Sequence, residues 1–425
     1  MLLRIFLPVL LCLPLLGKAQ TFDTIRVMTY NLTNYGNNIS PCTAANNGLT
    51  LKNPAFKTIM QYVKPDVLGV CEMNTNPSIA GSFLSNVLNT DGVNHFARSA
   101  AVAEPSGTIT NVLFYNSEKL GLKFQSQAQT VYRLTHHFRL YLKTESLALG
   151  DTIWLNVLLC HLKAGTATQD VADRGSMALT IRNYLNNFPK KENCMIMGDF
   201  NVYRSSETAF QTLTSASPST LYQFVDPINR VGTWTSNASF ADVHTQCPRT
   251  DNNGGCYSGG GMDDRFDFIF MNKHLINDSA GLSYLSGTYK AIGNDGQHYN
   301  SNINSAPVNN SAPANVISAL YLASDHLPVR ADLKVAGNFL SPVKTQSKKA
   351  DLALWFKNGK VFTEYSEAPM EIAVFDMNGK CCWKGNLSTD EDGSLPLPEF
   401  SLKGLKMLQV ATKNGRKGSL RFLIP

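Results

Sequence analysis

Several carboxylate, carboxamide and imidazole side chains of this sequence stand directly beside apolar, strand-like runs. In chain order they are Asn31, Glu72, His161, Asp199, Asn201, Asp267, Asp325 and His326. Each has an ordinary structural explanation on its own, because Asp and Asn form turns and a histidine after an apolar run is usually a hydrogen-bonded core residue. Asp267 fits that explanation least, since a carboxylate between Phe266 and Phe268 needs a partner.

Taken together, these residues predict metal-assisted hydrolysis. Carboxylate and amide oxygens are the ligands that Mg²⁺ or Mn²⁺ prefers. Two histidines beside such an ion suit phosphodiester hydrolysis, because one imidazole can orient or deprotonate water while the other hydrogen-bonds phosphoryl oxygens. In GDFN, Asp199 and Asn201 are two residues apart at a strand end and therefore share a face.

The elements that must position these residues form an alternating pattern. Strand-like runs cover residues 25–32, 66–72, 111–116, 153–162, 194–200, 266–271 and 326–333. Helices are predicted over residues 56–64, which end at Pro65, and over residues 170–187, where apolar residues recur every fourth position. Strands that are apolar on both faces and alternate with helices predict a layered α/β core, with the polar groups at one rim of a sheet.

Composition and charge bound the class of protein. The chain has 425 residues, of which 43% are hydrophobic and 16% charged, as in an ordinary globular protein of one large and one small domain. The net charge of +6 comes from the two ends of the chain, because residues 20–345 hold 24 basic and 23 acidic side chains. Global charge therefore gives no support to a nucleic-acid partner.

The first 19 residues are predicted to be a signal peptide. Arg4 precedes an apolar run that ends before the small residues of GKA, and the run is too short to span a bilayer. No later run reaches that length, so we expect an exported, soluble chain without an integral membrane segment. Export permits disulfides, and Cys247 and Cys256 are the candidate pair because they flank a loop rich in Gly and Asn. Buried free thiols are expected at Cys71, Cys160 and Cys194.

The character of the sequence changes near residue 340. Residues 339–350 are a predicted linker between a catalytic domain at 20–338 and a small all-β module at 351–425. Asn-Gly pairs at 358–359, 378–379 and 414–415 separate short apolar runs in this module and predict hairpins.

The order of motifs TYN, E, HLK, GDFN, RFD and SDH resembles the endonuclease/exonuclease/phosphatase superfamily of DNase I-like enzymes, over about residues 24–335. The resemblance implies a four-layer α/β sandwich, in which two mixed β-sheets pack face to face with helices outside. It also implies that Glu72 is the main Mg²⁺ (or Mn²⁺) ligand, with Asn31 and Asp325 near the ion.

The same resemblance assigns the remaining residues to water and phosphate. Asp199 would position or activate the attacking water, and Asn201 would hold the phosphate. His326, paired with Asp267, would be a base or a phosphate stabiliser, and His161 would contact the scissile phosphate. The family also has a phosphate-gripping residue that the sequence does not identify; the candidates are Tyr132, Arg133, His136, His137 and Arg139, with Lys163 as a further phosphate contact.

The expected function is therefore that of a secreted, monomeric, metal-dependent nuclease acting on extracellular DNA or RNA. The alternatives are a secreted phospholipid diesterase of the sphingomyelinase type, a phosphatase of the same fold, and a binding protein without activity. Membrane-active members carry an exposed aromatic hairpin, and residues 286–315 offer only Tyr289 and Tyr299, which disfavours a lipid substrate. DNA against RNA, endo- against exo-action and the base preference stay open.

The C-terminal module has its own resemblance. VFDMNGK and the last 23 residues, which begin KGLKMLQVAT, are similar to the C-terminal sorting domain of type IX secretion substrates. This implies the secretion machinery as a partner. The Gly-x-Tyr of that domain is replaced by Gly404-Leu405-Lys406. The alternative is a plain β-sandwich accessory module that binds a ligand or the cell surface.

Overall fold

The structure is a computed structural model. It describes residues 22–424 apart from 105–106, 188–191, 216–222, 341–351, 358–359, 364–369, 377–378, 398–403 and 413–416. The predicted signal peptide and most of the predicted linker lie outside the described residues. Within the described ranges, no helix is both long and apolar enough to cross a membrane.

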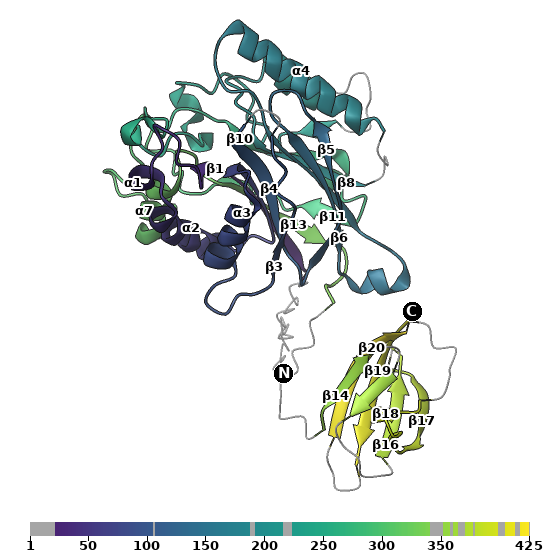
Figure 1. Cartoon of the computed structure of the whole chain (residues 1–425). Coiled ribbons are helices and arrows are strands. Elements are labelled where there is room, and N and C mark those ends of the chain that lie inside the picture. The colour runs from purple at the N-terminus through teal and green to yellow at the C-terminus, as the bar shows by residue number, and fades with distance from the viewer. Residues whose placement is uncertain are drawn as a thin grey trace, which may run out of the picture.

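Two mixed β-sheets form the centre of the large domain (Figure 1). The first sheet has the order β11-β13-β1-β2-β4-β3, with β12 paired to β13. Its strands are β1 (Thr24–Tyr35), β2 (Val67–Asn74), β3 (Phe96–Arg98), β4 (Ile109–Asn116), β11 (Leu282–Tyr284), β12 (Lys290–Ala291) and β13 (Val329–Val335). The neighbours β1 and β2 are parallel, and the other neighbouring strands of this sheet are antiparallel.

The second sheet has the order β5-β6-β7-β8-β10-β9. Its strands are β5 (Leu120–Gln129), β6 (Thr135–Leu142), β7 (Trp154–His161), β8 (Asn193–Asp199), β9 (Phe224–Val225) and β10 (Asp267–Asn272). Here β7 and β8 are the parallel pair. Both sheets are therefore mixed, as predicted. The sequence analysis did not identify β3, β5, β6, β9, β11 or β12, because these strands lack a long apolar run or are only two or three residues long.

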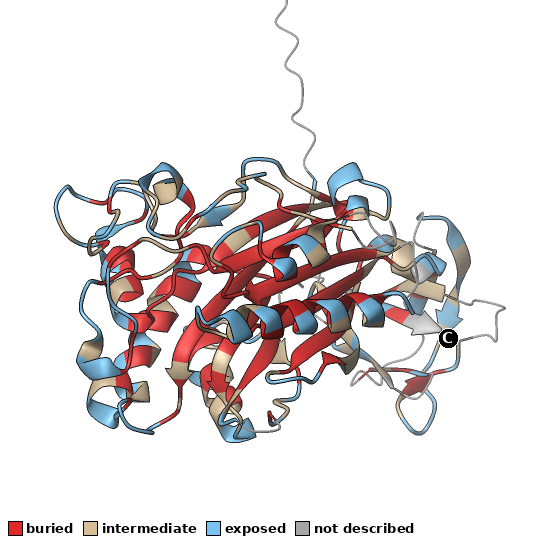
Figure 2. Ribbon diagram, turned by 90° about the horizontal axis from the view of Figure 1, so that it is seen from above, coloured by how far each residue is buried: buried red, intermediate tan, exposed pale blue. Residues whose placement is uncertain are grey.

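Helices cover the outer face of each sheet, and this confirms the predicted four layers. On the first sheet lie α2 (Leu49–Val63), α3 (Pro77–Phe83) and α7 (Ala314–Ala323), and on the second lie α4 (Thr168–Leu185) and α5 (Thr208–Thr214). A third apolar core fills the space between the sheets. Figure 2 shows the buried residues concentrated in the strands, with the exposed faces of the helices outermost. Two short helices, α1 (Ala44–Asn47) and α6 (Lys273–Asn277), complete the domain.

The alternation of side chains along the strands decides which residues reach the space between the sheets. In β7, Leu158 and Cys160 pack under α4, whereas Val157 and Leu159 belong to the central core. Because successive side chains point to opposite faces, His161 continues the inner row. Asp199 continues the inner row of β8 in the same way, after Met197.

The C-terminal module is all-β, as predicted. Its strands are β14 (Leu354–Lys357), β15 (Lys360–Thr363), β16 (Met370–Phe375), β17 (Cys381–Leu387), β18 (Ser394–Leu395), β19 (Gly404–Ala411) and β20 (Lys417–Ile424). The three predicted hairpins are present, since β14 pairs with β15, β16 with β17 and β19 with β20, all antiparallel. The apolar core of this module is formed by residues between 352 and 422.

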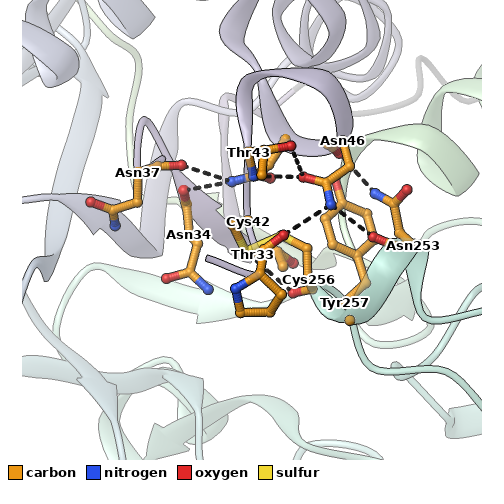
Figure 3. The surroundings of a disulfide bond; sticks show 12 residues. Thr33, Asn34, Asn37, Cys42, Thr43, Asn46, Asn253, Cys256 and Tyr257 are labelled. Carbon is orange, nitrogen blue, oxygen red and sulfur yellow. Dashed lines mark hydrogen bonds between the residues drawn. A yellow bond between two sulfur atoms is a disulfide. The ribbon is translucent and has the colours of Figure 1, made fainter. Parts of the chain in front are cut away.

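The predicted Cys247–Cys256 disulfide is wrong. Cys256 is bonded to Cys42, which is 214 residues away in the sequence, and Cys247 is a buried free thiol that donates to Ser258 O (Figure 3). The segment that follows β1 lies against the loop of Cys256, and nothing local in the sequence reports that contact. Cys71, Cys160 and Cys194 are buried free thiols, as expected.

Candidate active site

Residues from both sheets meet at one end of the space between them. The first sheet supplies Asn31 in β1 and Glu72 in β2, together with Asp325 and His326 shortly before β13. The second sheet supplies His161 and Asp199, which end β7 and β8, and Asp267, which begins β10; the strand register pairs Asp199 with each of the other two. The residues predicted from the sequence are thus close together, although they span nearly 300 positions.

Three of these residues form a group able to hold a metal ion. One ligand atom each from Glu72, His161 and Asp199 lies within 4.8 Å of the others. His161 Nε2 is 3.4 Å from Asp199 Oδ2 and 3.6 Å from Glu72 Oε1. Two carboxylates and an imidazole are donors that a divalent cation accepts, and carboxylates dominate sites for Mg²⁺ and Mn²⁺. The donor set therefore fits the expected ion, with His161 as a member that the sequence analysis had assigned to phosphate.

Asn31 holds the two carboxylates of this group together. Its Nδ2 donates to Glu72 Oε1 and to Asp199 Oδ2, both at 3.0 Å, while its Oδ1 accepts from the Thr33 backbone N–H at 2.9 Å. The amide nitrogen, which cannot ligate a hard cation, faces the carboxylates. In this orientation Asn31 holds the two carboxylates together, near the ion position where the sequence predicted it.

A β-bulge directs Glu72 toward the site. Val70 and Met73 both pack on the outer face of the first sheet and Cys71 on the inner face, so the alternation slips by one residue at Glu72. Glu72 has a φ of 59°, which is unusual for a residue other than glycine, and its Oε2 accepts from Asn34 N at 3.0 Å. Local strain of this kind persists where the surrounding structure enforces it, commonly at functional sites.

The GDFN motif has a specific backbone conformation. Gly198 has a φ of 138°, and a Cβ there would meet Cys160 O at 1.9 Å, so no other residue fits between β7 and β8. Asn201 has a φ of 50°; its N–H donates to Asp199 Oδ1 at 3.0 Å, and its Nδ2 donates to Leu162 O at 3.2 Å. The backbone of the motif thereby anchors one oxygen of Asp199 and leaves Oδ2 directed at His161 and Asn31.

His326 and Asp267 form a buried pair. His326 Nδ1 is 2.7 Å from Asp267 Oδ2, and His326 Nε2 is 3.8 Å from Asp199 Oδ2. Asp267 is completely buried, and its Oδ1 has no hydrogen-bond partner among the described residues. Gln246, which the sequence analysis did not consider, places its amide Nε2 2.7 Å from His326 Nε2.

The two histidines have opposite electrostatic environments. Burial opposes the charged form of His326, but the charges of Asp267 and Asp199 outweigh it and raise the pKa of His326 well above its ordinary value. Burial, assisted by the charges of Arg133 and His326, lowers the pKa of His161 well below its ordinary value. At neutral pH, His161 is thus a neutral ligand or acceptor and His326 a cationic donor.

Asp199 is sensitive to the presence of a cation. Burial raises the pKa of Asp199 to about 7, and the negative charges of Asp267 and Glu72 add to this effect, against the opposing influence of His326 and Asn31. A carboxylate that is buried beside other carboxylates ionises more readily when a cation is bound. The raised pKa is consistent with a metal ion between Glu72 and Asp199.

Asp325 lies beside this group. Its Oδ1 accepts a short hydrogen bond from Thr33 Oγ1, and its Oδ2 accepts from Ser258 N at 2.7 Å. Asp325 Oδ1 is 3.9 Å from His326 Nε2. Among the described residues, the group of three ligand atoms does not include Asp325, so the structure brings it near the expected metal position without making it part of the group.

Arg133 is the phosphate-gripping candidate that lies at the site. Its guanidinium contacts His161 Nε2, and its Nη1 is 3.4 Å from Leu162 O. His136 and His137 are buried in β6 and Arg139 pairs with Glu192, so these three do not face the site. Tyr132, whose φ is 61°, bonds to Asp173 instead. Lys163 is likewise directed away, because its Nζ is 2.6 Å from Asp170 Oδ1.

No protein-family model and no curated protein matches the chain. Solved structures with a similar fold include an endonuclease/exonuclease/phosphatase from Bacteroides vulgatus, with 16% identity, a TM-score of 0.46, and coverage of 74% of this chain and 99% of that one. A mannosyl-6-phosphatase from Bacteroides thetaiotaomicron has 14% identity and a TM-score of 0.43, with 73% and 99% covered. TDP2 from D. rerio, complexed with a single strand DNA product, has 10% identity and a TM-score of 0.45, with 73% and 99% covered. At these values the likeness says nothing about substrate or mechanism.

Proposed function

We propose that the chain is a divalent-metal-dependent phosphoesterase, and specifically an exported nuclease that hydrolyses phosphodiester bonds in extracellular DNA or RNA. One observation carries this proposal. The buried group of Glu72, His161 and Asp199 lies next to the cationic His326–Asp267 pair, so that a cation position and a proton-donating imidazole adjoin a single place. Phosphoester hydrolysis needs both features, since negative charge develops on phosphoryl oxygens.

The metal would be held by Glu72 and Asp199 with His161, and Mg²⁺ or Mn²⁺ suits the carboxylates. Bound there, the ion supplies charge neutralisation on the phosphate and lowers the pKa of a coordinated water. Asn31 donates hydrogen bonds to both carboxylates. These bonds hold the two negative charges close together before a cation binds. Asp325 adds a further negative charge near the ion.

The side chains of the protein account for the other requirements of the reaction. His326 carries a proton on Nε2 when it is cationic and would donate it in a hydrogen bond to a phosphoryl oxygen. Asp267 fixes the orientation of the ring through Nδ1. Arg133 offers a planar guanidinium beside His161 for the same phosphate. Asp199 would orient the attacking water through Oδ2, the oxygen that faces Asn31 and His161.

The proposed substrate class depends on which side chains residues 286–315 expose. The sequence analysis identified Tyr289 and Tyr299 as the two aromatic residues of this segment. Tyr289 accepts a hydrogen bond from Ile269 N and Tyr299 packs beside His244, and the strongly exposed apolar side chain of this segment is Val308. Among the described residues the segment therefore presents no aromatic side chain suited to entering a membrane, which favours nucleic acid over a phospholipid. Export, the use of secretion machinery through the C-terminal module, and a monomeric state belong to the same proposal.

The test is nicking of supercoiled plasmid by the full chain, with Mg²⁺ or Mn²⁺ and then with EDTA. We expect relaxation of the plasmid that needs the metal and falls by at least about 100-fold in His326→Ala, as for loss of a general acid or base. His95→Ala is the matched control, because His95 is half-buried and directly precedes β3, which pairs with the C-terminal end of β4, away from the site.

Intact plasmid under every condition would contradict DNA endonuclease activity. RNA, sphingomyelin and a phosphomonoester would then be tested with the same pair of variants. Nicking that survives both EDTA and His326→Ala would contradict the metal-dependent mechanism itself.

A further inference from the structure

A buried disulfide joins two loops that flank the candidate site. Cys42 lies in the segment that follows β1, and Cys256 lies in a loop formed by residues 247–261 (Figure 3). Both cysteines are less than a tenth exposed. The two loops come from opposite parts of the sequence, and the disulfide is the covalent link between them.

A reciprocal pair of asparagines forms a second tie between the same loops. Asn46 Nδ2 donates to Asn253 O at 3.0 Å, and Asn253 Nδ2 donates to Asn46 O at 2.8 Å (Figure 3). Lys52 in α2 forms a third, because its ammonium donates to Asn47 Oδ1 in the first segment at 2.7 Å and lies over the ring of Tyr257, 5.2 Å from its centroid. The loops are thus joined by one covalent and two non-covalent connections.

A backbone N–H beside or within each loop also donates to one carboxylate of the site. Asn34 N, in β1 just before the first loop, donates to Glu72 Oε2 at 3.0 Å. Ser258 N, two residues after Cys256, donates to Asp325 Oδ2 at 2.7 Å. The disulfide therefore connects the donor that orients Glu72 to the donor that orients Asp325.

We propose that these joined loops act as a clamp that holds the candidate ligand Glu72 and the neighbouring charge of Asp325 in place for a divalent cation, so that the Cys42–Cys256 disulfide raises metal affinity. This inference rests on the proposed function. Carboxylates that converge on one position repel each other when no cation is bound, and fixed backbone donors restrain them. Because the restraint exists before the ion arrives, less ordering remains to be done on binding.

The experiment measures Mn²⁺ binding by electron paramagnetic resonance in the full chain, well below the unfolding temperature of every variant. The variants are Cys42→Ser/Cys256→Ser, which removes the covalent tie, and Asn46→Ala/Asn253→Ala, which removes the reciprocal hydrogen bonds. We expect Mn²⁺ affinity to fall about tenfold without the disulfide, the usual scale for loss of outer-shell support, and further when both pairs are replaced. Reduction of the wild-type disulfide by dithiothreitol should lower Mn²⁺ affinity as much as the serine variant does. This measurement replaces the serine variant if that variant fails to fold.

The matched control separates affinity from general stability. Leu185→Ala creates a cavity in the core beneath α4, far from both loops in the sequence, and lowers the unfolding temperature without touching the clamp. Its Mn²⁺ affinity should equal that of the wild type. Equal affinity in the wild type and in the disulfide-free protein would overturn the clamp and leave the proposed function standing. No Mn²⁺ binding by the wild type would overturn both.

Discussion

Two neighbouring histidines of β6 show that hydrogen-bond partners decide whether a buried polar group destabilises the folded state. Burial lowers the pKa of His136 and of His137 to about 4. His137 bonds through both nitrogens, to Tyr184 Oη and Asn156 Oδ1, whereas neither nitrogen of His136 has a hydrogen-bond partner among the described residues. His136 instead stacks on Phe138. A buried polar group without a partner destabilises the folded state, and one with partners does not.

We therefore predict opposite effects of one substitution at adjacent positions. His136→Phe keeps the ring and removes two unsatisfied nitrogens, so the free energy of unfolding should rise by about 1 kcal/mol at neutral pH. His137→Phe removes the hydrogen bonds to Asn156 Oδ1 and Tyr184 Oη, and it should lower the free energy of unfolding by about 1–3 kcal/mol. Urea unfolding measures both, and a loss of stability in His136→Phe would contradict the argument.

His136 and His137 also predict how the stability of the fold declines at acid pH. A histidine whose folded-state pKa is lowered stays neutral in the folded state while the unfolded chain takes up a proton, so stability is lost as the pH falls from about 6.5 towards 4. For His136 alone this loss is on the order of 2–3 kcal/mol. His136→Phe should therefore flatten the decline, seen by urea unfolding at about pH 7 and about pH 4.5.

Asp199 and His326 have the opposite effect on the pH dependence of stability in the metal-free protein: their contributions decrease as the pH rises. Burial raises the pKa of Asp199 to about 7, so its contribution to stability falls as the pH rises from about 4 to 7. The pKa of His326 is raised well above its usual value, and its contribution is present below about pH 6.5 and lost as the pH rises through the folded-state pKa. We expect Mn²⁺ to increase the unfolding temperature more at about pH 8 than at about pH 6, because only ionised Asp199 binds it. Asp199→Asn should abolish this pH-dependent metal effect; an unchanged effect would exclude Asp199 as a ligand.

Among the secondary-structure elements, α4 positions the segment that follows His161. Arg174 is completely buried in this helix, pairs with Glu207, and donates to Lys163 O and Gly165 O. Glu207 in turn accepts from Tyr203 N, just after the GDFN motif. One buried ion pair thus fixes the two loops that leave β7 and β8.

We predict that Arg174→Ala lowers the free energy of unfolding by about 3–5 kcal/mol, because Glu207 is left buried and unpaired. Arg174→Met/Glu207→Leu, which removes both charges, should be much less destabilising. Chemical denaturation distinguishes them. Equal losses in the single and double variants would show that packing volume, and not the unpaired charge, causes the effect.

The sequence predicted the elements that carry long apolar runs and the polar residues that follow them. His161, Asp199 and Glu72 were found because each stands at the end of an apolar run. The role of Glu72 as main ligand came from the resemblance, since its orientation depends on a bulge with a positive φ that no local pattern signals. Arg133 was one of five candidates for the phosphate-gripping residue, and the sequence could not select it. The turn at Tyr132, with its positive φ, decides which side chain faces His161.

At the scale of the whole molecule, the described residues form separate apolar cores in the large domain and in the C-terminal module. Phe339, expected in the linker, packs in the core between the sheets of the large domain. The disulfide was missed because Cys42 and Cys256 are neighbours only once β1 and the 247–261 loop are assembled. Long-range pairing of this kind has no signal in the sequence of one chain.

The separate cores predict that a chain ending at residue 340 folds and keeps its activity. Its unfolding temperature should lie within about 2 °C of the corresponding transition of the full chain, since no core contact is removed. Differential scanning calorimetry of both proteins measures this, and the full chain should show an additional transition from the module. A loss of several degrees on truncation would show that the module stabilises the large domain.

The candidate ligands are shared between the two sheets, and this has a mechanical consequence. Glu72 belongs to the first sheet and Asp199 to the second, so an ion bound by both would bridge the two halves of the sandwich across their apolar interface. Pulling the sheets apart would have to break ionic contacts as well as expose apolar surface. The loaded protein should then resist forced unfolding and proteases more than the empty one.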